Sequence, residues 1–252
     1  MAEVVANHIL APAATASFSE TKVCLVTGGS SGIGAAVCQD FLKRGFQVIS
    51  VARRPCPHEG VQNLLADLGK QEEMVKAADE AVSIIGSKKE VHFIHCASSY
   101  PNDTADKPDV AGMNLAFQLN VIAASVFLEK LFPLMAQNSS LILCGSTLSE
   151  KAVPGKLSYC TAKHAMVGFM RAITQDLFCS GVHTVLVCPG ITDTPMVRDA
   201  TKDNPEGFNA FVKDLQGRIL SCEEIAAVMA QAAFQPVLNG SVIHCNGGQR
   251  EK

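Results

Sequence analysis

Tyr159 and Lys163 form the pair of residues whose types and spacing best suit proton-transfer chemistry. Four residues apart on a helix, their side chains project from one face, one turn apart. A positive charge beside a phenol favours the phenolate, so we expect Lys163 to lower the pKa of Tyr159 from about 10 toward neutrality. A tyrosine tuned in this way acts as a general acid or base. The pair alone is a weak signal, because both residue types are common on helix surfaces, and its neighbours decide the interpretation.

Two more polar residues belong to the candidate catalytic set. The apolar run from Leu141 to Cys144 predicts a buried strand, and Ser146 follows it, so the strand end and the start of the Tyr159 helix can meet at one point. Asn120 lies in a long, mostly apolar helical stretch, where its buried amide must find hydrogen-bond partners. For Asn120, a functional role and a structural role as a helix-bending core residue are equally compatible with the sequence.

A glycine-rich turn links the first predicted strand to the first predicted helix. The apolar run Lys22–Thr27 leads into this turn, and helical periodicity follows from Ala35 to Lys43. In such an arrangement the glycines let the backbone approach a pyrophosphate, whose charge is met by the helix N-terminus. A plain turn with a glycine cap is the alternative. The candidate dinucleotide-binding residues are Gly28, Ser30, Ser31, Gly32, Ile33 and Gly34.

The second predicted strand, Phe46–Ala52, ends in Arg53 and Arg54. An acidic residue near this position holds the ribose of NAD, whereas an arginine suits the 2′-phosphate of NADP. Here Ala52 stands where an acid could sit, and the Arg53 guanidinium can fork onto phosphate oxygens and stack on adenine. The sequence therefore predicts NADP(H), with a solvated loop end as the alternative. Asp67 is a candidate to accept from the adenine amino group or, nearly as well, a turn residue.

The last candidate cofactor residues follow an apolar run, His183 to Cys188, that predicts another strand. They are Pro189, Gly190, Thr192 and Thr194. Residues from about 194 to 220 are mixed and carry several large apolar side chains, which suits a lid that closes over substrate. A surface helix with no functional role is the alternative.

Composition excludes several classes of function. The chain has 252 residues and a net charge of -3, with acids and bases interspersed. This pattern lacks the basic patch that binds nucleic acid or an anionic membrane. The ten cysteines lie mostly in apolar runs without zinc-type spacing, so we expect no metal and a reducing compartment, the cytoplasm.

Residues 1–20 contain no Lys or Arg and predict a flexible arm rather than a targeting signal. The run Leu115–Leu128 is too short to span a bilayer and predicts a buried helix.

Strand and helix patterns alternate over residues 21–252 without a repeat or a low-complexity linker. This alternation predicts a single α/β domain, a doubly wound parallel sheet of about seven strands with helices on both faces.

From about Lys22 to Gly248 the sequence resembles the short-chain dehydrogenase/reductase family, whose fold is Rossmann-like. The resemblance rests on motifs in the family order: Thr27-Gly-Gly-Ser-Ser-Gly-Ile-Gly34, Ser146, Tyr159-x-x-x-Lys163, Pro189-Gly190 and Gly247-Gly248. It implies an NADPH-dependent carbonyl reductase that interconverts a ketone or aldehyde and an alcohol. It also implies a homodimer or homotetramer, built through the helices that carry Asn120 and Tyr159.

The resemblance implies a role for each matching residue. Tyr159 would be the general acid in reduction, while Lys163 would lower its pKa and hold the nicotinamide ribose. Ser146 would bind the substrate oxygen, and Asn120 would hold a water that relays protons through Lys163. Thr194 would contact the nicotinamide carboxamide.

One segment departs from the family pattern, because His95-Cys96-Ala97-Ser98 stands where the family usually has Asn-Asn-Ala-Gly. The serine adds a side chain where backbone approaches the cofactor, and the lost asparagine removes a hydrogen bond between strands. This departure motivates an alternative function, a non-catalytic dinucleotide-binding regulatory or scaffold protein. The residues expected to line the substrate pocket are too mixed to indicate a substrate: Ser98, Ser99, Tyr100, Glu150 and Val153.

Overall fold

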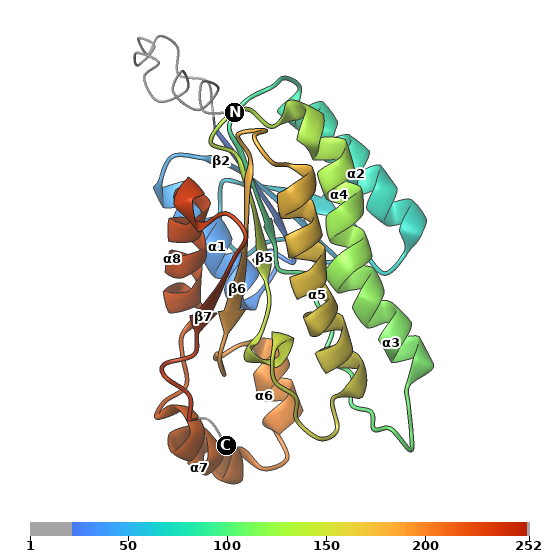
Figure 1. Ribbon diagram of the computed structural model, residues 1–252, viewed down its shortest axis with the longest axis vertical. Coiled ribbons are helices and arrows are strands. Elements are labelled where there is room, and N and C mark those ends of the chain that lie inside the picture. Colours follow the sequence, from blue (N-terminus) through green and yellow to red (C-terminus); the bar gives the residue numbers. More distant parts are fainter. Residues whose placement is uncertain (1–21, 251–252) are drawn as a thin grey trace, which may run out of the picture.

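Seven parallel strands form one sheet with the order β3-β2-β1-β4-β5-β6-β7 (Figure 1). The strands are β1 (Val23–Thr27), β2 (Gln47–Ala52), β3 (Val61–Leu65), β4 (Val91–His95), β5 (Ser140–Cys144), β6 (His183–Pro189) and β7 (Ser241–Cys245). The structure is a computed structural model that describes residues 22–250, so the predicted arm of residues 1–20 lies outside it. The predicted parallel α/β sheet is confirmed.

Helices cover both faces of the sheet (Figure 1). One face carries α1 (Gly32–Lys43) and α8 (Cys222–Ala233), and the other carries α2 (Gln71–Ile85), α4 (Ala123–Leu131) and α5 (Leu157–Asp176). A hydrophobic core fills the space on each side. Successive strand residues point to opposite cores: Phe93 packs on the α2, α4 and α5 side, and Ile94 on the α1 and α8 side. This burial on both faces explains why the strands are continuous apolar runs.

A single long helical run precedes β5. It comprises α3 (Val110–Phe117), a π-helical turn (Gln118–Ile122), α4 and a 3-10 turn (Phe132–Leu134). By length and composition alone the run Val110–Leu134 could cross a membrane, but Ala124 and Phe127 pack into the core against the sheet. Leu115 and Ile122 are 41% and 43% exposed. The prediction of a buried helix is therefore wrong for the face that carries these two side chains.

The carboxyl ends of the strands meet at one edge of the sheet, together with the remaining short helices (Figure 1). These are a 3-10 turn after β5 (Thr147–Ser149), α6 (Pro195–Thr201) and α7 (Pro205–Gln216), while a further 3-10 turn (Pro236–Leu238) precedes β7. The order of the strands reverses between β1 and β4. In doubly wound sheets such a reversal opens a crevice at the carboxyl edge, where ligands bind.

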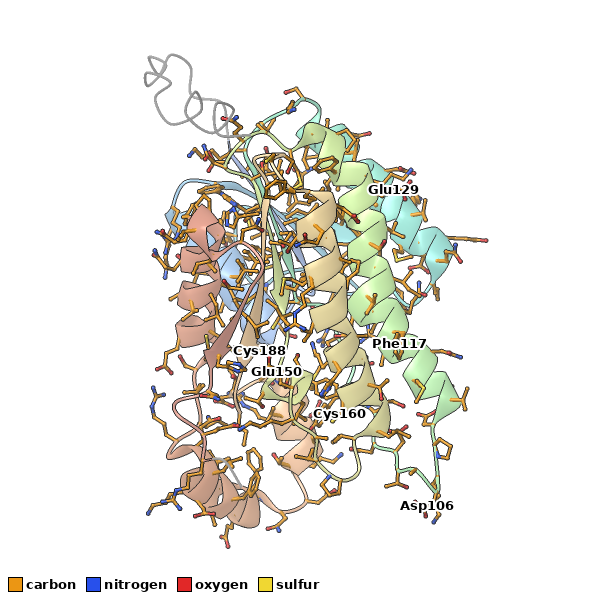
Figure 2. All side chains as sticks on the ribbon, in the orientation of Figure 1. Asp106, Phe117, Glu129, Glu150, Cys160 and Cys188 are labelled. Atoms are coloured by element: carbon orange, nitrogen blue, oxygen red, sulfur yellow. The ribbon has the colours of Figure 1, made fainter. Side chains whose placement is uncertain are left out.

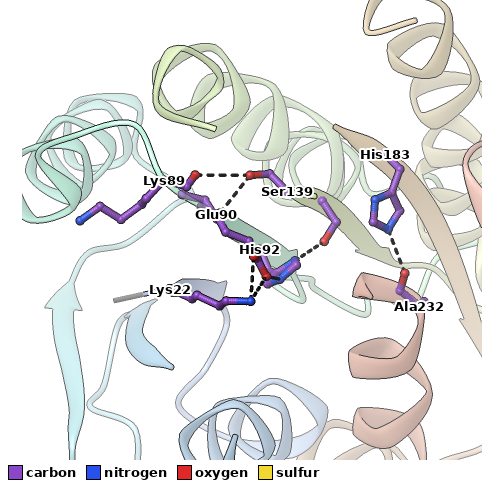
Figure 3. A network of polar contacts seen from close by, with 9 residues as sticks. Lys22, Lys89, Glu90, His92, Ser139, His183 and Ala232 are labelled. Carbon is purple, nitrogen blue, oxygen red and sulfur yellow. Dashed lines mark hydrogen bonds and ion pairs between the residues drawn. The ribbon is translucent and has the colours of Figure 1, made fainter. Parts of the chain in front are cut away.

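Two buried histidines, His92 and His183, lie at the amino ends of β4 and β6 (Figure 3). His92 is fully buried, with Nδ1 2.8 Å from Ser140 Oγ and Nε2 3.1 Å from Glu90 Oε1. His183 Nε2 donates to the carbonyl oxygen of Ala232 at 3.0 Å. Burial is the largest influence on both rings: it lowers the pKa of His92 to about 4 and also lowers the pKa of His183. These contacts make His92 a hydrogen-bonded core histidine.

Acidification is expected to destabilise the fold through His92. Its folded-state pKa lies below the usual 6.5, so the stabilisation is fully present above about pH 6.5 and is lost as the pH falls toward 4. At pH 5 the loss from this side chain is about 2 kcal/mol. Urea unfolding at pH 7 and pH 5 measures it, and a His92→Gln variant should show a correspondingly smaller pH effect. An equal pH effect in that variant would contradict the assignment.

Candidate active site

A cavity of about 530 Å³ opens at the carboxyl edge of the sheet. Every residue predicted from the sequence to bind cofactor or take part in chemistry lines it, except Asn120: Gly28, Ser30, Ser31, Gly32, Ile33, Gly34, Arg53, Arg54, Asp67, Ser146, Tyr159, Lys163, Pro189, Gly190, Thr192 and Thr194. Residues more than 150 positions apart in the sequence thus share one cavity. Within residues 22–250 no cluster of three or more His, Cys, Asp or Glu side chains is arranged to hold a metal ion.

The glycine turn after β1 is packed too closely for side chains. Gly28 has a φ of +76°, and a Cβ there would lie 2.8 Å from the backbone nitrogen of Ala97. A Cβ on Gly34 would lie 2.3 Å from the carbonyl oxygen of Gly28. The Ser31 side chain does not cap α1, so the first backbone N–H groups of this helix have no side-chain acceptor there, and the turn that precedes them lines the cavity. Such a cradle fits a dinucleotide pyrophosphate.

The end of β2 and the start of the next loop form the far wall of the cavity. Arg53 and Arg54 follow β2 and are exposed at this wall. Asp67 also lines the cavity, but its Oδ1 accepts a hydrogen bond from the backbone N–H of Gly69 at 3.0 Å. Asp67 is therefore a turn residue in this structure, and its Oδ2 is left for a ligand.

Ser146, Tyr159 and Lys163 meet at the other end of the cavity. Ser146 Oγ accepts from the backbone N–H of Leu148 at 3.1 Å, a bond that leaves its hydroxyl proton available to a neighbouring acceptor or a ligand. Tyr159 and Lys163 are 8% and 3% exposed. Lys163 Nζ donates to the carbonyl oxygen of Cys144 at 2.8 Å and lies 5.6 Å from the centroid of the Tyr159 ring.

The expectation that Lys163 lowers the pKa of Tyr159 is wrong for this structure. Burial, the largest influence, raises the pKa of Tyr159 above its usual value, and the hydrogen bond with Ser146 only partly offsets it. Burial likewise lowers the pKa of Lys163. Both groups lose solvation of their charged forms, and the ammonium is directed at a backbone carbonyl rather than at the phenol oxygen. The tyrosine is therefore held in its protonated form.

Tyr100 packs against the candidate acid. The rings of Tyr100 and Tyr159 meet edge to face with centroids 4.7 Å apart. Lys156 Nζ lies 3.3 Å from the centroid of the Tyr100 ring and donates to Asn102 Oδ1. The three side chains form a stack that fixes the orientation of the Tyr159 ring.

The segment that departs from the family pattern makes its own hydrogen bonds. His95 Nδ1 lies 2.8 Å from Thr27 Oγ1 on β1, and Nε2 donates to the carbonyl oxygen of Leu119 at 2.8 Å. Ser98 Oγ donates to Asn120 Oδ1 at 3.0 Å, and Asn120 Nδ2 donates to the carbonyl oxygen of Ala116 at 2.8 Å. The expected loss of a bond between strands is thus compensated by His95.

Asn120 is fully buried in the π-helical turn and does not line the cavity. Both ends of its amide are satisfied by Ser98 and Ala116, as the structural alternative for this residue requires. π-Helical turns occur frequently at functional sites, so the turn itself agrees with a role near the reaction. A water held by the Asn120 side chain would have to share Oδ1 with Ser98 or Nδ2 with the Ala116 carbonyl.

The region predicted to be a lid folds as α6 and α7. Thr194 Oγ1 accepts from the backbone N–H of Val197 at 3.2 Å and so caps α6. Gln216, at the end of α7, accepts from the backbone N–H of Ile191 at 2.7 Å and donates to its carbonyl oxygen at 2.9 Å. This pair of bonds ties α7 to the loop after β6.

Several cavity residues were not named individually from the sequence, although two of them, Met196 and Asp199, fall within the predicted lid. Asp199 and Met196 on α6 line the cavity, as do Leu115 on α3 and the thiols of Cys96 and Cys144. A sequence pattern does not reveal them, because their position depends on how the helices pack. Glu150, expected in the substrate pocket, does not line this cavity and pairs with His244 at 2.9 Å; Figure 2 labels Glu150 near the carboxyl ends of the strands.

Comparisons with known proteins agree with this geometry. The family model described as short chain dehydrogenase matches residues 22–205. The chain belongs to the short-chain dehydrogenase/reductase family. One relative within this family is the ipsdienol dehydrogenase of Ips pini, which is 27% identical over 250 residues, covering 92% of this chain and 98% of that protein.

Solved structures of short-chain dehydrogenase/reductases share the fold. A short chain dehydrogenase family protein from Francisella tularensis superposes with a TM-score of 0.83 at 23% identity, over 90% of this chain and 98% of the other. The RhlG/NADP active-site complex of Pseudomonas aeruginosa superposes with a TM-score of 0.81 at 24% identity, over 91% and 97% of the two chains. These similarities establish the Rossmann-like architecture, and the chemistry rests on the residues of this chain.

Proposed function

We propose that this short-chain dehydrogenase/reductase is an NADP(H)-dependent carbonyl reductase that acts on a ketone or aldehyde. The observation that carries the proposal is the meeting of Ser146, Tyr159 and Lys163 in the same cavity as the glycine cradle. The dinucleotide, when bound, supplies the hydride. The work left to the protein is to orient a carbonyl group and to deliver a proton to its oxygen.

Ser146 and Tyr159 suit this task. The Ser146 hydroxyl, fixed by the backbone of Leu148, can donate to the carbonyl oxygen and so orient the substrate. Tyr159 is buried and protonated, and its phenol can donate the proton as the oxygen gains negative charge. Burial weakens the phenol as an acid, and a positive charge brought close to it favours proton release. Lys163 lies one helical turn away to hold the cofactor ribose and replace the proton.

The remaining features of the proposal concern self-association, cellular localisation and substrate class. The exposed apolar side chains of Ile122 and Phe132 on the long helical run support self-association through it, as a dimer or a tetramer. Ten reduced cysteines support a role in the cytoplasm. A relative named for the dehydrogenation of ipsdienol supports an alcohol or carbonyl substrate.

Oxidation of NADPH by the purified protein, measured with a panel of ketones and aldehydes, tests the proposal. We expect turnover with at least one carbonyl compound. NADPH binding without any turnover would favour the alternative, a non-catalytic regulatory or scaffold protein. The segment that motivates this alternative, residues 95–98, stays bonded to neighbouring elements, through His95 to Thr27 and the Leu119 carbonyl and through Ser98 to Asn120, which supports an ordered cavity wall.

Arg53 is expected to set the preference for NADPH over NADH. Arg53→Ala removes a guanidinium at the cavity wall that suits a 2′-phosphate, and charge-assisted bonds of this kind contribute about 1.5–3 kcal/mol. We therefore expect a KM for NADPH roughly 10- to 100-fold higher and a KM for NADH that changes little. An Arg171→Ala variant, on the exposed face of α5, is the matched control for loss of one positive charge. Equal losses for both cofactors would contradict the phosphate role.

A further inference from the structure

Two cysteines lie side by side in the floor of the cavity. The register of β4 and β5 pairs His95 with Leu143, so Cys96, directly after β4, is the neighbour of Cys144, the last residue of β5. Both residues line the cavity and pack on the α1 and α8 side of the sheet. Neighbouring strands are about 4.8 Å apart, and Cα atoms joined by a disulfide are about 4.4–6.8 Å apart. A disulfide between these two thiols therefore requires only a local shift of the backbone at the carboxyl ends of β4 and β5.

The surroundings of the pair make one thiol reactive. A hydrogen bond from the Cys96 thiol, together with the charge of Lys163, lowers the pKa of Cys144 to about 7 in spite of its burial. The same lysine places its Nζ 2.8 Å from the Cys144 carbonyl oxygen. Thiolates beside a cationic group are the cysteines that react with oxidants. Cys144 thus has a charged neighbour, a second thiol and a cavity through which a small oxidant can enter.

The chain offers an internal comparison. Cys38 and Cys56 are also neighbouring thiols, close enough for Cys56 to influence the pKa of Cys38. Burial raises the pKa of Cys38 well above its usual value, neither residue lines the cavity, and no positive charge is among the influences on Cys38. Proximity is common to the two pairs, whereas access and a cationic neighbour distinguish Cys96 and Cys144.

From this geometry we infer that Cys96 and Cys144 form a peroxide-sensitive thiol pair whose oxidation to a disulfide closes the dinucleotide cavity. The Cys144 thiolate attacks one oxygen of hydrogen peroxide, the O–O bond breaks, and the leaving hydroxide takes a proton to become water. The resulting sulfenic acid is attacked by the Cys96 sulfur, which loses its proton; the S–O bond breaks and a second water leaves. Two thiols and one peroxide thus give one disulfide and two waters.

The disulfide would act on the site in two ways. Cys96 precedes Ala97, and the backbone nitrogen of Ala97 lies so close to Gly28 that a Cβ there would be 2.8 Å away. Pulling Cys96 toward Cys144 moves this backbone and therefore disturbs the glycine cradle. It also displaces the Cys144 carbonyl that accepts from Lys163. This consequence rests on the proposed dinucleotide site, whereas the formation of the disulfide does not. A bound dinucleotide covers the cavity floor and should slow the oxidation.

Treatment of the whole protein with hydrogen peroxide tests the inference. We expect a loss of two of the ten thiols, a Cys96–Cys144 cross-linked peptide in mass spectrometry, and recovery of both thiols on addition of dithiothreitol. NADPH binding should fall in parallel with the cross-link, and NADPH added first should slow both. During peroxide treatment, a Cys96→Ser variant should retain its initial NADPH affinity for longer than the wild type does. A Cys38→Ser variant should lose NADPH binding at the same rate as the wild type.

The cross-link in the wild-type protein needs no variant and decides the chemistry by itself. If peroxide joins Cys38 to Cys56 as readily, or produces no cross-link between Cys96 and Cys144, the inference is overturned. If the cross-link forms but NADPH binding persists, the closing of the cavity is overturned. If the cross-link forms but the untreated protein does not bind NADPH, the thiol chemistry stands and the proposed function is contradicted instead.

Discussion

A Tyr159→Phe variant is expected to bind NADPH as the wild type does and to lose carbonyl reduction by a factor of roughly 10²–10⁴, the contribution of a positioned general acid. The substitution removes only the phenol oxygen. The ring and its edge-to-face contact with Tyr100 remain, so the fold and the cavity should persist. Steady-state kinetics with the best substrate of the panel, together with NADPH titration by fluorescence, measure both quantities.

The second tyrosine of the chain supplies the matched control. Tyr100→Phe removes a hydroxyl from the neighbouring ring, whose centroid lies 4.7 Å from that of Tyr159. Its effect on kcat should be far smaller, because the Tyr100 hydroxyl has no part in proton transfer. Equal losses of kcat in the two variants would show that ring surroundings, rather than the Tyr159 hydroxyl, carry the activity.

Gly28→Ala is expected to abolish dinucleotide binding and to destabilise the fold by more than about 3 kcal/mol. Part of this cost, about 1–2 kcal/mol, comes from placing an alanine at a φ of +76°. The rest comes from a Cβ 2.8 Å from the backbone nitrogen of Ala97, which cannot move without displacing the end of β4. Urea unfolding and NADPH titration measure the two effects.

Gly45→Ala separates these two causes. Gly45 has a φ of +82°, close to that of Gly28, but a Cβ there meets nothing within 4 Å. This variant should show only the conformational cost, about 1–2 kcal/mol, and should bind NADPH normally. If Gly28→Ala costs no more than Gly45→Ala, the close approach of the glycine turn to Ala97 is not required.

Local patterns predicted the elements that position the site. The glycine turn, the end of β5 at Ser146 and the one-turn spacing of Tyr159 and Lys163 depend on nearby residues and on strand order, so the sequence sufficed to bring them to one cavity. The sheet followed from alternating apolar runs for the same reason. Family membership and fold are confirmed, while the roles of these residues remain proposals.

Properties that depend on packing were not predictable in this way. The direction of the Tyr159 pKa depends on burial, which a spacing between two residues does not reveal. The partners of His95, Thr27 and the Leu119 carbonyl, are remote in sequence, so the compensation for the lost asparagine was invisible. Gln216 looks like any polar residue of an amphipathic helix until its two bonds to Ile191 are seen.

A crystal structure with NADP and a carbonyl substrate analogue tests the central claim most directly. We predict that the carbonyl oxygen of the analogue lies within hydrogen-bond distance, about 2.6–3.2 Å, of both Tyr159 Oη and Ser146 Oγ, with the dinucleotide pyrophosphate on the N-terminus of α1. A carbonyl oxygen held by other groups, with the Tyr159 hydroxyl directed away from it, would contradict the proposed mechanism.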